Sequence, residues 1–408
     1  MQTNFSAELL ATDRGQRANE ILRSCVHCGF CNATCPTYQL TGDELDGPRG
    51  RIYLIRDLLE ELGDSKRSQM HLDRCLTCRA CETTCPSGVA YGELAEIARN
   101  KLGPRRRGLK NWLRVFVRWL VPNASRLRQM AQLGKMTRPF IPYRLKQHIP
   151  QRIGMGVVAN ERHARKVLLL NGCAQQVATA TTNEHFLNLL DEQGIGVEIA
   201  SQEGCCGALD LHLGDESRAL ERIRQNVDAL SVHLDTCEAI VSTASGCGVT
   251  IKDYGRLLAD DCEYAEAAAM VSDAALDVVE YVERASLDLR KRDDIDRVAW
   301  HAPCSLQHGM KITGSVEKCL VAVGYELVPT KDPHICCGSA GSYSMLEPKM
   351  SDELGRRKVE TLLQHDPEII ATANVGCQTH LGHRTGVPVV HWLELLACPK
   401  PPAQVRPG

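Results

Sequence analysis

Several features that mark other classes of protein are missing from this 408-residue sequence. It contains no run of about 18 or more apolar residues, so no membrane-spanning helix is expected. Residues Met1 to Ala11 lack a basic leader followed by an apolar stretch, which argues against a secretory signal. The formal net charge of −2 predicts neither a nucleic-acid binder nor an acidic tail. These absences favour a cytoplasmic protein whose contact with a membrane, if any, is peripheral.

A dinucleotide-binding fingerprint is missing as well. The nearest sequence is Gly154-Met-Gly156-Val-Val-Ala159, and no strand-like run precedes it. Hydride or two-electron chemistry on a hydroxy acid needs a flavin or a nicotinamide. If the protein takes part in such a reaction, we therefore expect no flavin in this chain and a flavin-containing subunit as its partner.

What the sequence has in excess is cysteine, with 20 residues. Thiols stay reduced in the cytoplasm, so a cysteine-rich chain favours metal binding or redox chemistry over disulfides. Cysteine spacing and composition divide the chain into four regions. We expect a domain at 1–100, a connector at 101–164, and two related domains at 165–295 and 296–398.

Two copies of one cysteine motif occupy the first region. The motif is Cys-x-x-Cys-x-x-Cys-x-x-x-Cys-Pro, and its cysteines are Cys25, Cys28, Cys31 and Cys35, then Cys75, Cys78, Cys81 and Cys85. Bacterial ferredoxins use this spacing to bind 4Fe-4S clusters. Zinc sites also use Cys-x-x-Cys, but two complete four-cysteine runs with the terminal proline are hard to explain as zinc knuckles.

In such runs the fourth cysteine reaches the neighbouring cluster. The spacing therefore predicts one 4Fe-4S cluster on Cys25, Cys28, Cys31 and Cys85, and a second on Cys35, Cys75, Cys78 and Cys81. Four thiolates per cluster leave no iron open to a substrate. The predicted role is thus electron transfer, and no catalytic residue is expected here.

The third and fourth regions duplicate each other. Each has one cysteine, then Cys-Cys-Gly after 31 residues, then one more cysteine. The two sets, offset by 131, 131 and 130 residues, are Cys173, Cys205, Cys206 and Cys247, and Cys304, Cys336, Cys337 and Cys377. Short apolar runs precede the cysteines and helical patterns lie between them, so each region is predicted to be an α/β unit.

Four thiols in each unit suffice for an additional iron-sulfur cluster or for a zinc ion. Adjacent cysteines rarely form a disulfide with each other because its geometry is strained, so both Cys-Cys pairs favour a metal. Two alternatives stay open: zinc rather than iron in one unit, and one unit whose cysteines are only small buried side chains. The remaining cysteines are interpreted as packing residues: Cys237, Cys262, Cys319 and Cys398.

These motifs together resemble the family that includes heterodisulfide reductase subunits, lactate-utilisation proteins and the iron-sulfur subunits of anaerobic glycerol-3-phosphate dehydrogenase and glycolate oxidase. The runs Cys25–Ile55 and Leu72–Gly88 look most like the glycolate oxidase iron-sulfur subunits. The resemblance implies an α+β multi-domain fold, with an α-helical ferredoxin-like domain followed by two duplicated α/β Cys-Cys-Gly domains.

The resemblance also implies a function. A flavin-bearing subunit would oxidise glycolate to glyoxylate, and this chain would relay the electrons towards a quinone or another acceptor. An iron-sulfur subunit of a D-lactate or glycerol-3-phosphate dehydrogenase would carry the same features, because the substrate is oxidised on another subunit. A heterodisulfide-reductase-like enzyme and a zinc-stabilised assembly protein are the further alternatives.

One departure from the wider family concerns its disulfide-reducing members. In those proteins another cysteine lies three positions after the last cysteine of each repeat. This sequence has Thr250 and His380 at those positions. Loss of that thiolate argues against disulfide reduction. His380 could replace a thiolate and raise the potential of a cluster, or it could be an ordinary surface histidine.

The connector is basic throughout, since residues 101–160 contain 14 Lys or Arg and no Asp or Glu. One face of a predicted helix is apolar, formed by Leu109, Trp112, Leu113, Phe116, Val117 and Leu120. Its basic residues fall largely elsewhere: Arg106, Arg107, Lys110, Arg114 and Arg118. Three interpretations stay open: contact with an anionic membrane, contact with a partner subunit, and an apolar stripe packed inward with solvated arginines. Nucleic acid is not expected as a partner.

Overall fold

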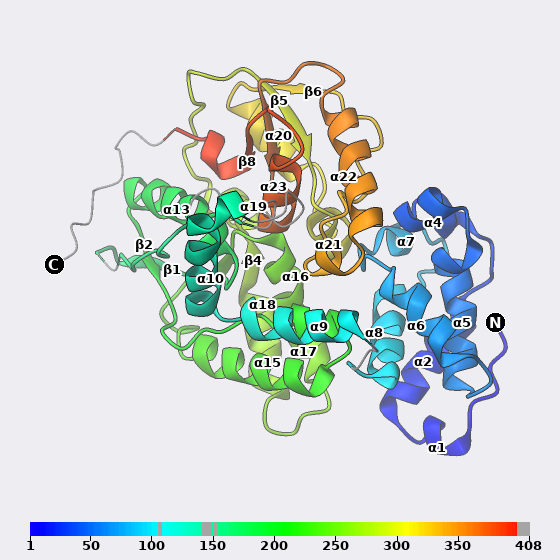
Figure 1. The fold of residues 1–408 in the computed structure, drawn as a ribbon. Coiled ribbons are helices and arrows are strands. Elements are labelled where there is room, and N and C mark those ends of the chain that lie inside the picture. Colours follow the sequence, from blue (N-terminus) through cyan, green and yellow to red (C-terminus); the bar gives the residue numbers. More distant parts are fainter. Residues whose placement is uncertain (105–107, 141–148, 151–152, 161, 398–408) are drawn as a thin grey trace.

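The computed structural model describes residues 1–104, 108–140, 149–150, 153–160 and 162–397. A helical N-terminal unit lies to one side of two α/β units, and helices of the connector lie at their junction (Figure 1). The predicted α+β multi-domain fold is confirmed. Among the described residues, no helix has both the length and the apolar character needed to cross a membrane.

Short helices arranged around the cysteine motifs build the N-terminal unit. They are α1 (Ala7–Leu10), α2 (Asp13–Ser24), α3 (Phe30–Ala33), α4 (Pro36–Thr41), η1 (Glu44–Asp46), α5 (Pro48–Leu59), α6 (Ser65–Asp73), α7 (Ala80–Thr83) and α8 (Tyr91–Leu102). Helix α8 packs on α2 and α5, where Leu22, Ile55 and Leu94 are fully buried. Proline begins α4 and α5, at a position where its missing N–H is not needed.

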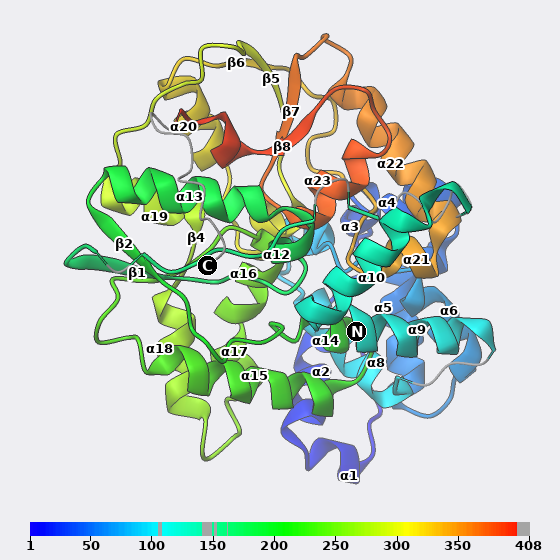
Figure 2. The ribbon, with the colours of Figure 1, turned by 60° about the vertical axis from the view of Figure 1, so that its left-hand side comes forward.

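The first α/β unit contains a four-stranded parallel sheet in the order β2-β1-β3-β4 (Figure 2). Its strands are β1 (Arg165–Leu169), β2 (Ile195–Glu198), β3 (Ile240–Ser242) and β4 (Ala275–Asp277). Its helices are α12 (Gln175–Ala178), α13 (Ala180–Glu192), α14 (Ala208–His212), α15 (Glu216–Ser231), α16 (Ser245–Lys252), α17 (Tyr254–Leu257), α18 (Ala265–Ala274) and α19 (Val278–Ala285).

The second α/β unit repeats this topology, with a parallel sheet in the order β6-β5-β7-β8. Its strands are β5 (Arg297–His301), β6 (Glu326–Val328), β7 (Ile369–Thr372) and β8 (Val389–His391). Its helical elements are η3 (Ser305–Gly309), α20 (Ser315–Ala322), α21 (Tyr343–Leu346), α22 (Pro348–Leu362), α23 (Val375–Gly382) and η4 (Trp392–Leu395).

The two α/β units share one hydrophobic core. It includes Val167 and Phe186 from the first unit and Val298, Leu320 and Trp392 from the second. The contacts between the units are reciprocal. Helix α13 of the first unit packs on η4 of the second unit. Helix α20 of the second unit corresponds to α13, and it packs on α19 of the first unit, which corresponds to η4. In the same way α16 contacts η3, and α12 contacts α23. The duplication in the sequence is therefore a pseudo-symmetric pair with a common buried interface.

Helices α9 (Leu109–Leu120) and α10 (Ala124–Met136) form the connector, and α9 turns its charged side inward. Arg114 forms an ion pair of 2.9 Å with Asp73 of the N-terminal unit. Arg118 lies 2.8 Å from Asp210 of the first α/β unit and also pairs with Asp215. Both arginine side chains are buried. The interpretation that the arginines are merely solvated is therefore wrong for Arg114 and Arg118, whereas Val117 of the apolar stripe does pack inward.

The aromatic residues of α9 consequently face outward. Trp112 is 66% exposed and Trp119 is 45% exposed, and Val115 between them is also exposed. The ring of Phe116 stacks on Trp112 at 5.7 Å and lies 6.0 Å from the Trp119 ring. The predicted helix exists, but its two tryptophans face outward while Val117 of the same apolar stripe is buried beside Arg114 and Arg118. Arg106 and Arg107 lie outside the described residues.

Arg118 provides a test of this inward orientation. Asp210 is fully buried, so removing its partner would leave a carboxylate whose charge only Arg222, at 2.8 Å, still balances. We expect Arg118→Ala to lower the free energy of unfolding by about 3 kcal/mol, measured by thermal and urea unfolding.

The matched control is Arg126→Ala. Arg126 is exposed and lies over the Trp119 ring at 4.9 Å, so its removal should cost less than about 1 kcal/mol. Equal losses in the two variants would contradict the buried ion pair.

Candidate metal centres

The sixteen cysteines predicted as ligands lie in four groups of four. We name them group 1 (Cys25, Cys28, Cys31, Cys85), group 2 (Cys35, Cys75, Cys78, Cys81), group 3 (Cys173, Cys205, Cys206, Cys247) and group 4 (Cys304, Cys336, Cys337, Cys377). Groups 1 and 2 each combine thiols from both N-terminal motifs, as the crossed assignment predicts. Each α/β unit contributes one of the other two groups.

Group 1 lies near the surface around a cavity. All four of its thiols line an empty space of about 420 Å³, part of it open to solvent. Burial raises the pKa of the Cys31 thiol to about 11, with further contributions from Cys25, Cys28 and Cys85. Cys28 is exposed, and the neighbouring side chains of Val26 and Phe30 are exposed too.

Group 2 lies deeper and lines a second empty space of about 360 Å³, part of it open to solvent. Burial, followed by the neighbouring thiols Cys78 and Cys75, raises the pKa of Cys81 well above its usual value. The Thr77 N–H donates to the Cys75 sulfur at 3.4 Å, and the Tyr91 hydroxyl donates to it at 3.7 Å. Donors aimed at ligand sulfur are a typical second shell of an iron-sulfur cluster.

The spacing of the sulfurs distinguishes a cluster from a single ion. A tetrahedral zinc ion, with Zn–S bonds of about 2.3 Å, would hold its sulfurs about 3.8 Å apart. In groups 1 and 2 the four thiols of each group instead line an empty space, of about 420 and 360 Å³ respectively, part of it open to solvent. The donor set and the cavities thus fit 4Fe-4S clusters better than zinc.

A buried arginine accompanies group 2 but not group 1. Arg51 is almost inaccessible, and its guanidinium lies 4.0 Å from the Cys35 sulfur. It is held by hydrogen bonds to the His71 carbonyl at 2.8 Å and to the Thr37 hydroxyl at 3.1 Å. Burial would lower the pKa of Arg51, but nearby thiols and Asp46 raise it, so the side chain stays charged.

Arg99 adds a second buried cation beside group 2. It donates to the carbonyl of Cys75 at 2.9 Å and to the Thr77 hydroxyl at 2.6 Å. Burial favours the neutral thiol of Cys75, yet Arg51 and Arg99 together lower its pKa below the usual value. Group 2 is therefore prepared to carry negative charge.

In group 3 the two adjacent cysteines are fixed through their backbone. The Asn226 amide donates to the Cys205 carbonyl at 3.1 Å, and the Tyr254 hydroxyl donates to the Cys206 carbonyl at 3.0 Å. A hydrogen bond with Cys205, together with burial, raises the pKa of Cys173 well above its usual value. All four thiols thus belong to one polar cluster in an otherwise apolar interior.

The glycine of each Cys-Cys-Gly motif has a structural reason. Gly207 and Gly338 both have φ near +89°, a conformation that other residues rarely adopt. A Cβ on Gly338 would come within 2.8 Å of the Leu354 Cβ and 2.9 Å of the Ser351 carbonyl oxygen. Only glycine lets the chain turn here and aim two successive thiols at the centre.

Group 4 is the most compact of the four. The sulfurs of Cys337 and Cys377 are 3.4 Å apart, and those of Cys304 and Cys336 are 3.9 Å apart. The Gly338 N–H donates to the Cys336 sulfur at 3.4 Å. These separations fit thiolates that share one metal atom, whether a zinc ion or one iron of a cluster.

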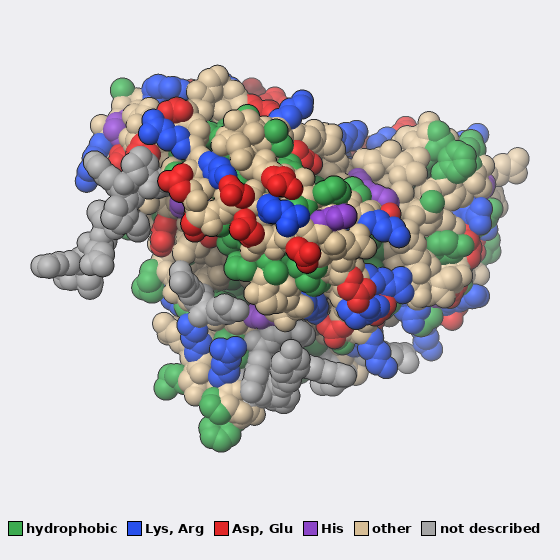
Figure 3. Space-filling view, turned by 90° about the horizontal axis from the view of Figure 1, so that it is seen from above, with side chains coloured by type: hydrophobic (Ala, Val, Ile, Leu, Met, Phe, Trp, Pro, Cys, Tyr) green, Lys and Arg blue, Asp and Glu red, His purple; other side chains and the backbone are tan. Residues whose placement is uncertain are grey.

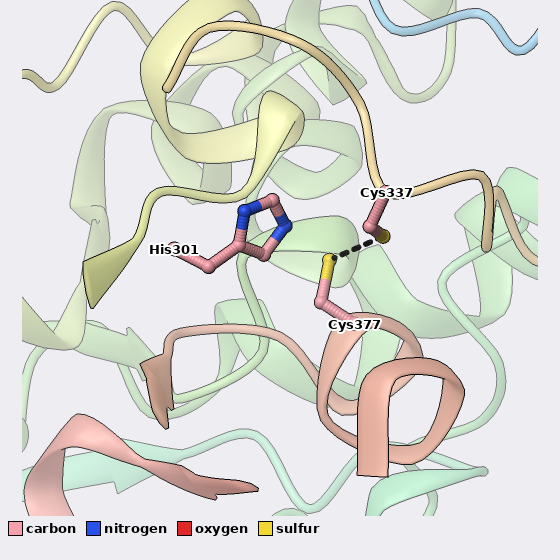
Figure 4. A group of neighbouring side chains, drawn as sticks. All are labelled: His301, Cys337 and Cys377. Atoms are coloured by element: carbon pink, nitrogen blue, oxygen red, sulfur yellow. Dashed lines mark hydrogen bonds between the residues drawn. The ribbon is translucent and has the colours of Figure 1, made fainter. Parts of the chain in front are cut away.

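A histidine that the motifs do not signal lies beside group 4. A nitrogen of His301 and the sulfurs of Cys337 and Cys377 all lie within 4.8 Å of one another (Figure 4). Burial, and then the charge of Lys358, holds the pKa of His301 well below its usual range. The sequence offered one signal for His301, namely the comparison of the two repeats, because the corresponding residue of the first unit is Leu170.

The sequence suggested His380 as a ligand, but His380 lies outside the group formed by His301, Cys337 and Cys377. Its Nδ1 is 3.3 Å from the Arg384 guanidinium. It is buried rather than a surface residue, and it does not belong to the ligand group that contains His301. Thr250, its counterpart in the first unit, bonds to the Gly246 carbonyl oxygen at 3.4 Å.

Groups 2 and 4 face each other across the interface between the N-terminal unit and the second α/β unit. Cys78 and Cys304 pack against one small buried cluster that includes Cys336. Burial, and then Cys304, raises the pKa of Cys78 well above its usual value. A hydrogen bond of 2.9 Å between Thr83 and His308 joins the two units beside this contact.

The four cysteines outside the motifs differ from one another. Cys237 and Cys319 are partly buried against the hydrophobic cores, as predicted for packing residues. Cys262 is exposed, so its interpretation as a packing residue is wrong. Cys398 lies outside the described residues.

The charge of Arg51 is expected to set the potential of the group 2 centre. A buried cation stabilises the reduced cluster, because reduction adds negative charge. We expect Arg51→Gln to lower the reduction potential of that cluster by roughly 100 mV, and Arg51→Lys to lower it by much less. Redox titration followed by EPR measures both values, with Cys85→Ser identifying the signal of the group 1 cluster.

The control for this prediction is Arg49→Gln. Arg49 lies near group 1, where it is partly exposed and paired with Glu44 at 2.6 Å. Its loss should change either potential by less than about 30 mV. An unchanged group 2 potential in Arg51→Gln would refute the electrostatic role of Arg51.

Two models of known protein families match parts of this chain. The family model described as a 4Fe-4S dicluster domain matches residues 21–89, and the one described as a cysteine-rich domain matches 167–252 and 298–382. These matches support iron-sulfur binding in this chain.

Three curated relatives show how far the similarity extends. The glycolate oxidase iron-sulfur subunit of Escherichia coli is 45% identical, covering 97% of this chain and 98% of the relative. The probable glycolate oxidase iron-sulfur subunit of Bacillus subtilis is 30% identical over 92% of this chain and 93% of that protein. Lactate utilization protein A of Bacillus licheniformis is 23% identical and covers only 57% of this chain, though 98% of its own length. The chain belongs to the family of glycolate oxidase iron-sulfur subunits.

Proposed function

We propose that this chain is the electron-transfer subunit of a glycolate dehydrogenase complex. It takes electrons from a flavin-bearing subunit that oxidises glycolate to glyoxylate and passes them towards a quinone or another acceptor. The observation that carries this proposal is the contact between groups 2 and 4, which brings Cys78 and Cys304 against one buried cluster. Electron transfer between fixed centres requires them to lie close together, and this interface meets that requirement.

The order of the groups in space suggests the direction of the path. Group 1 lies at the surface, with exposed Val26 and Phe30 beside exposed Cys28, so the flavin subunit docks there. Electrons then pass to group 2, whose reduced state Arg51 and Arg99 stabilise. Groups 1 and 2 each hold one 4Fe-4S cluster in this proposal.

From group 2 the path continues into the α/β units. Group 4 is adjacent, and group 3 follows through the contact between α16 and the turn before α23. There the Ser245 N–H donates to the Ala373 carbonyl at 3.2 Å, and the Gly246 N–H donates to the Asn374 side chain at 3.4 Å. Metal centres in groups 3 and 4 would extend the path beyond a simple two-cluster ferredoxin.

Two alternatives fit less well. Disulfide reduction needs a substrate to reach an open centre, yet the paired cysteines of both Cys-Cys-Gly motifs are buried. Oxidation of D-lactate is less favoured because the similarity to lactate utilization protein A covers 57% of the chain, against 97% for the Escherichia coli glycolate oxidase iron-sulfur subunit.

The proposal is tested by purifying the tagged chain without air and identifying the subunits that accompany it. We expect a flavoprotein to co-purify and a broad visible absorption that glycolate bleaches within seconds, at least tenfold faster than D-lactate or glycerol 3-phosphate does. Cys78→Ser should block transfer beyond the group 1 cluster and leave only partial bleaching.

Cys262→Ser, which changes an exposed cysteine outside the four groups, is the control and should behave as the unmodified protein. A colourless protein, or the absence of any flavoprotein, would refute the electron-transfer proposal. Faster bleaching by D-lactate would retain that role and change the substrate.

We further propose that the connector contacts an anionic membrane surface. Residues 101–160 contain no acidic side chain, and the outward aromatic face of α9 is followed by exposed Lys135 and Met136 on α10. Tryptophan with lysine and arginine is the composition of an interfacial helix. By contrast, basic and acidic side chains alternate over the face seen from above in Figure 3.

Vesicle binding tests the membrane proposal. We expect the complete protein to sediment with vesicles containing phosphatidylglycerol and not with pure phosphatidylcholine, in a manner that high salt weakens. Replacing Trp112 and Trp119 by serine should weaken binding at least tenfold. Val321→Ser, at an exposed apolar residue of α20, should leave it unchanged.

Full vesicle binding by the double tryptophan variant would contradict the membrane proposal. Loss of the co-purifying flavoprotein from that variant, without vesicle binding by the unmodified protein, would assign the surface to a partner subunit instead.

A further inference from the structure

The two Cys-Cys-Gly units differ at one position that matters for their metal centres. Leu170 of the first unit and His301 of the second unit occupy corresponding positions, three residues before the first cysteine of each unit. Leu170 is buried in an apolar cluster with Cys206. His301 brings a strong ligand atom to the same place in a structure that is otherwise duplicated.

The end of the sheet positions the imidazole. His301 is the last residue of β5, and Thr372 of β7 is its partner in the parallel register. Figure 4 shows the ring directed towards two cysteines that come from separate elements, Cys337 from the loop before α21 and Cys377 from the first turn of α23. Regular secondary structure therefore fixes two of the three groups.

The polar atoms of this histidine indicate a missing neighbour. The side chain is only 2% exposed, and within the described part of the chain its Nε2 has no hydrogen-bond partner. Leaving such a group unsatisfied in the interior is costly. In the described part of the chain, the nearby sulfurs of Cys337 and Cys377 make no hydrogen bond to this nitrogen. A metal ion bound by those sulfurs would satisfy it.

We propose that His301 is a ligand of the metal centre in group 4, bound through an imidazole nitrogen alongside Cys337 and Cys377. Group 3 then binds its metal with thiolates alone, and group 4 binds its metal with thiolates and one imidazole. This proposal rests on the proposed function only in requiring that group 4 holds a metal. It assigns the nitrogen ligand to His301 and not to His380.

The mixed ligand set changes the chemistry of the centre. An imidazole that takes the ligand position of one of the four thiolates of group 4 reduces the negative charge on the metal and raises the potential of an iron-sulfur cluster. Group 4 receives electrons from group 2, so a higher potential there favours transfer into the α/β units. If the metal is zinc, imidazole and thiolate together form one of its ordinary ligand sets.

The experiment compares three variants of the complete protein, purified without air. His301→Leu copies the first unit, His301→Cys replaces the nitrogen ligand by a thiolate, and His380→Thr copies the other position at which the repeats differ. Metal analysis shows whether group 4 holds iron or zinc. Nitrogen couplings in pulsed EPR of the reduced protein, with ¹⁵N-labelled histidine, follow an iron centre, and zinc-edge X-ray absorption follows zinc.

We expect His301→Leu to lose the metal of group 4, or its nitrogen signal, while the group 1 and group 2 signals remain. His301→Cys should keep the metal and lose the nitrogen signal, which a merely structural histidine would not explain. His380→Thr should keep both. His391→Leu, at another buried histidine of the same sheet, controls for disturbance of the fold.

Two results would overturn the assignment. A nitrogen signal that persists in His301→Cys and disappears in His380→Thr would make His380 the ligand. An unmodified protein with about eight iron atoms and no zinc would show that group 4 binds no metal. It would leave the two N-terminal clusters and the electron-transfer role intact and remove only the path through the α/β units.

Discussion

Burial of thiols in groups of four is the constraint on which the rest of this structure depends. A thiolate inside a protein is strongly disfavoured unless a cation lies beside it, and burial accordingly raises the pKa of Cys78, Cys81 and several other grouped thiols. Metal binding removes those protons and supplies the missing positive charge. The N-terminal unit has a small core of its own, so its short helices depend on the clusters that they surround.

The α/β units bring their buried thiols together in a different way. Parallel strands end at one edge of each sheet, and the cysteines follow in the loops and helix starts at that edge. The sharp turn at Gly207 or Gly338 lets two successive thiols face one centre. The shared core between the two units holds these edges together, so that group 3 and group 4 keep a fixed separation.

Local patterns explain which features the sequence could predict. Ligand spacing in the N-terminal motifs and the constant offset between repeats are local, and the structure brings those cysteines together. The orientation of α9 could not be predicted, because Arg114 and Arg118 pair with Asp73 and Asp210, whose positions along the chain give no signal of that contact. His301 was missed because a single histidine has no spacing pattern, and only its difference from Leu170 distinguishes it.

These differences between groups suggest why one chain would contain four of them. Identical centres would pass electrons in either direction equally well. Here group 1 contains the exposed Cys28, group 2 has Arg51 and Arg99 beside it, and group 4 has a neutral imidazole within reach. In the proposed path, each step would place the electron where the surroundings carry less uncompensated negative charge. The two units offer similar sites, and in the proposed assignment the difference between Leu170 and His301 makes them electrically unequal.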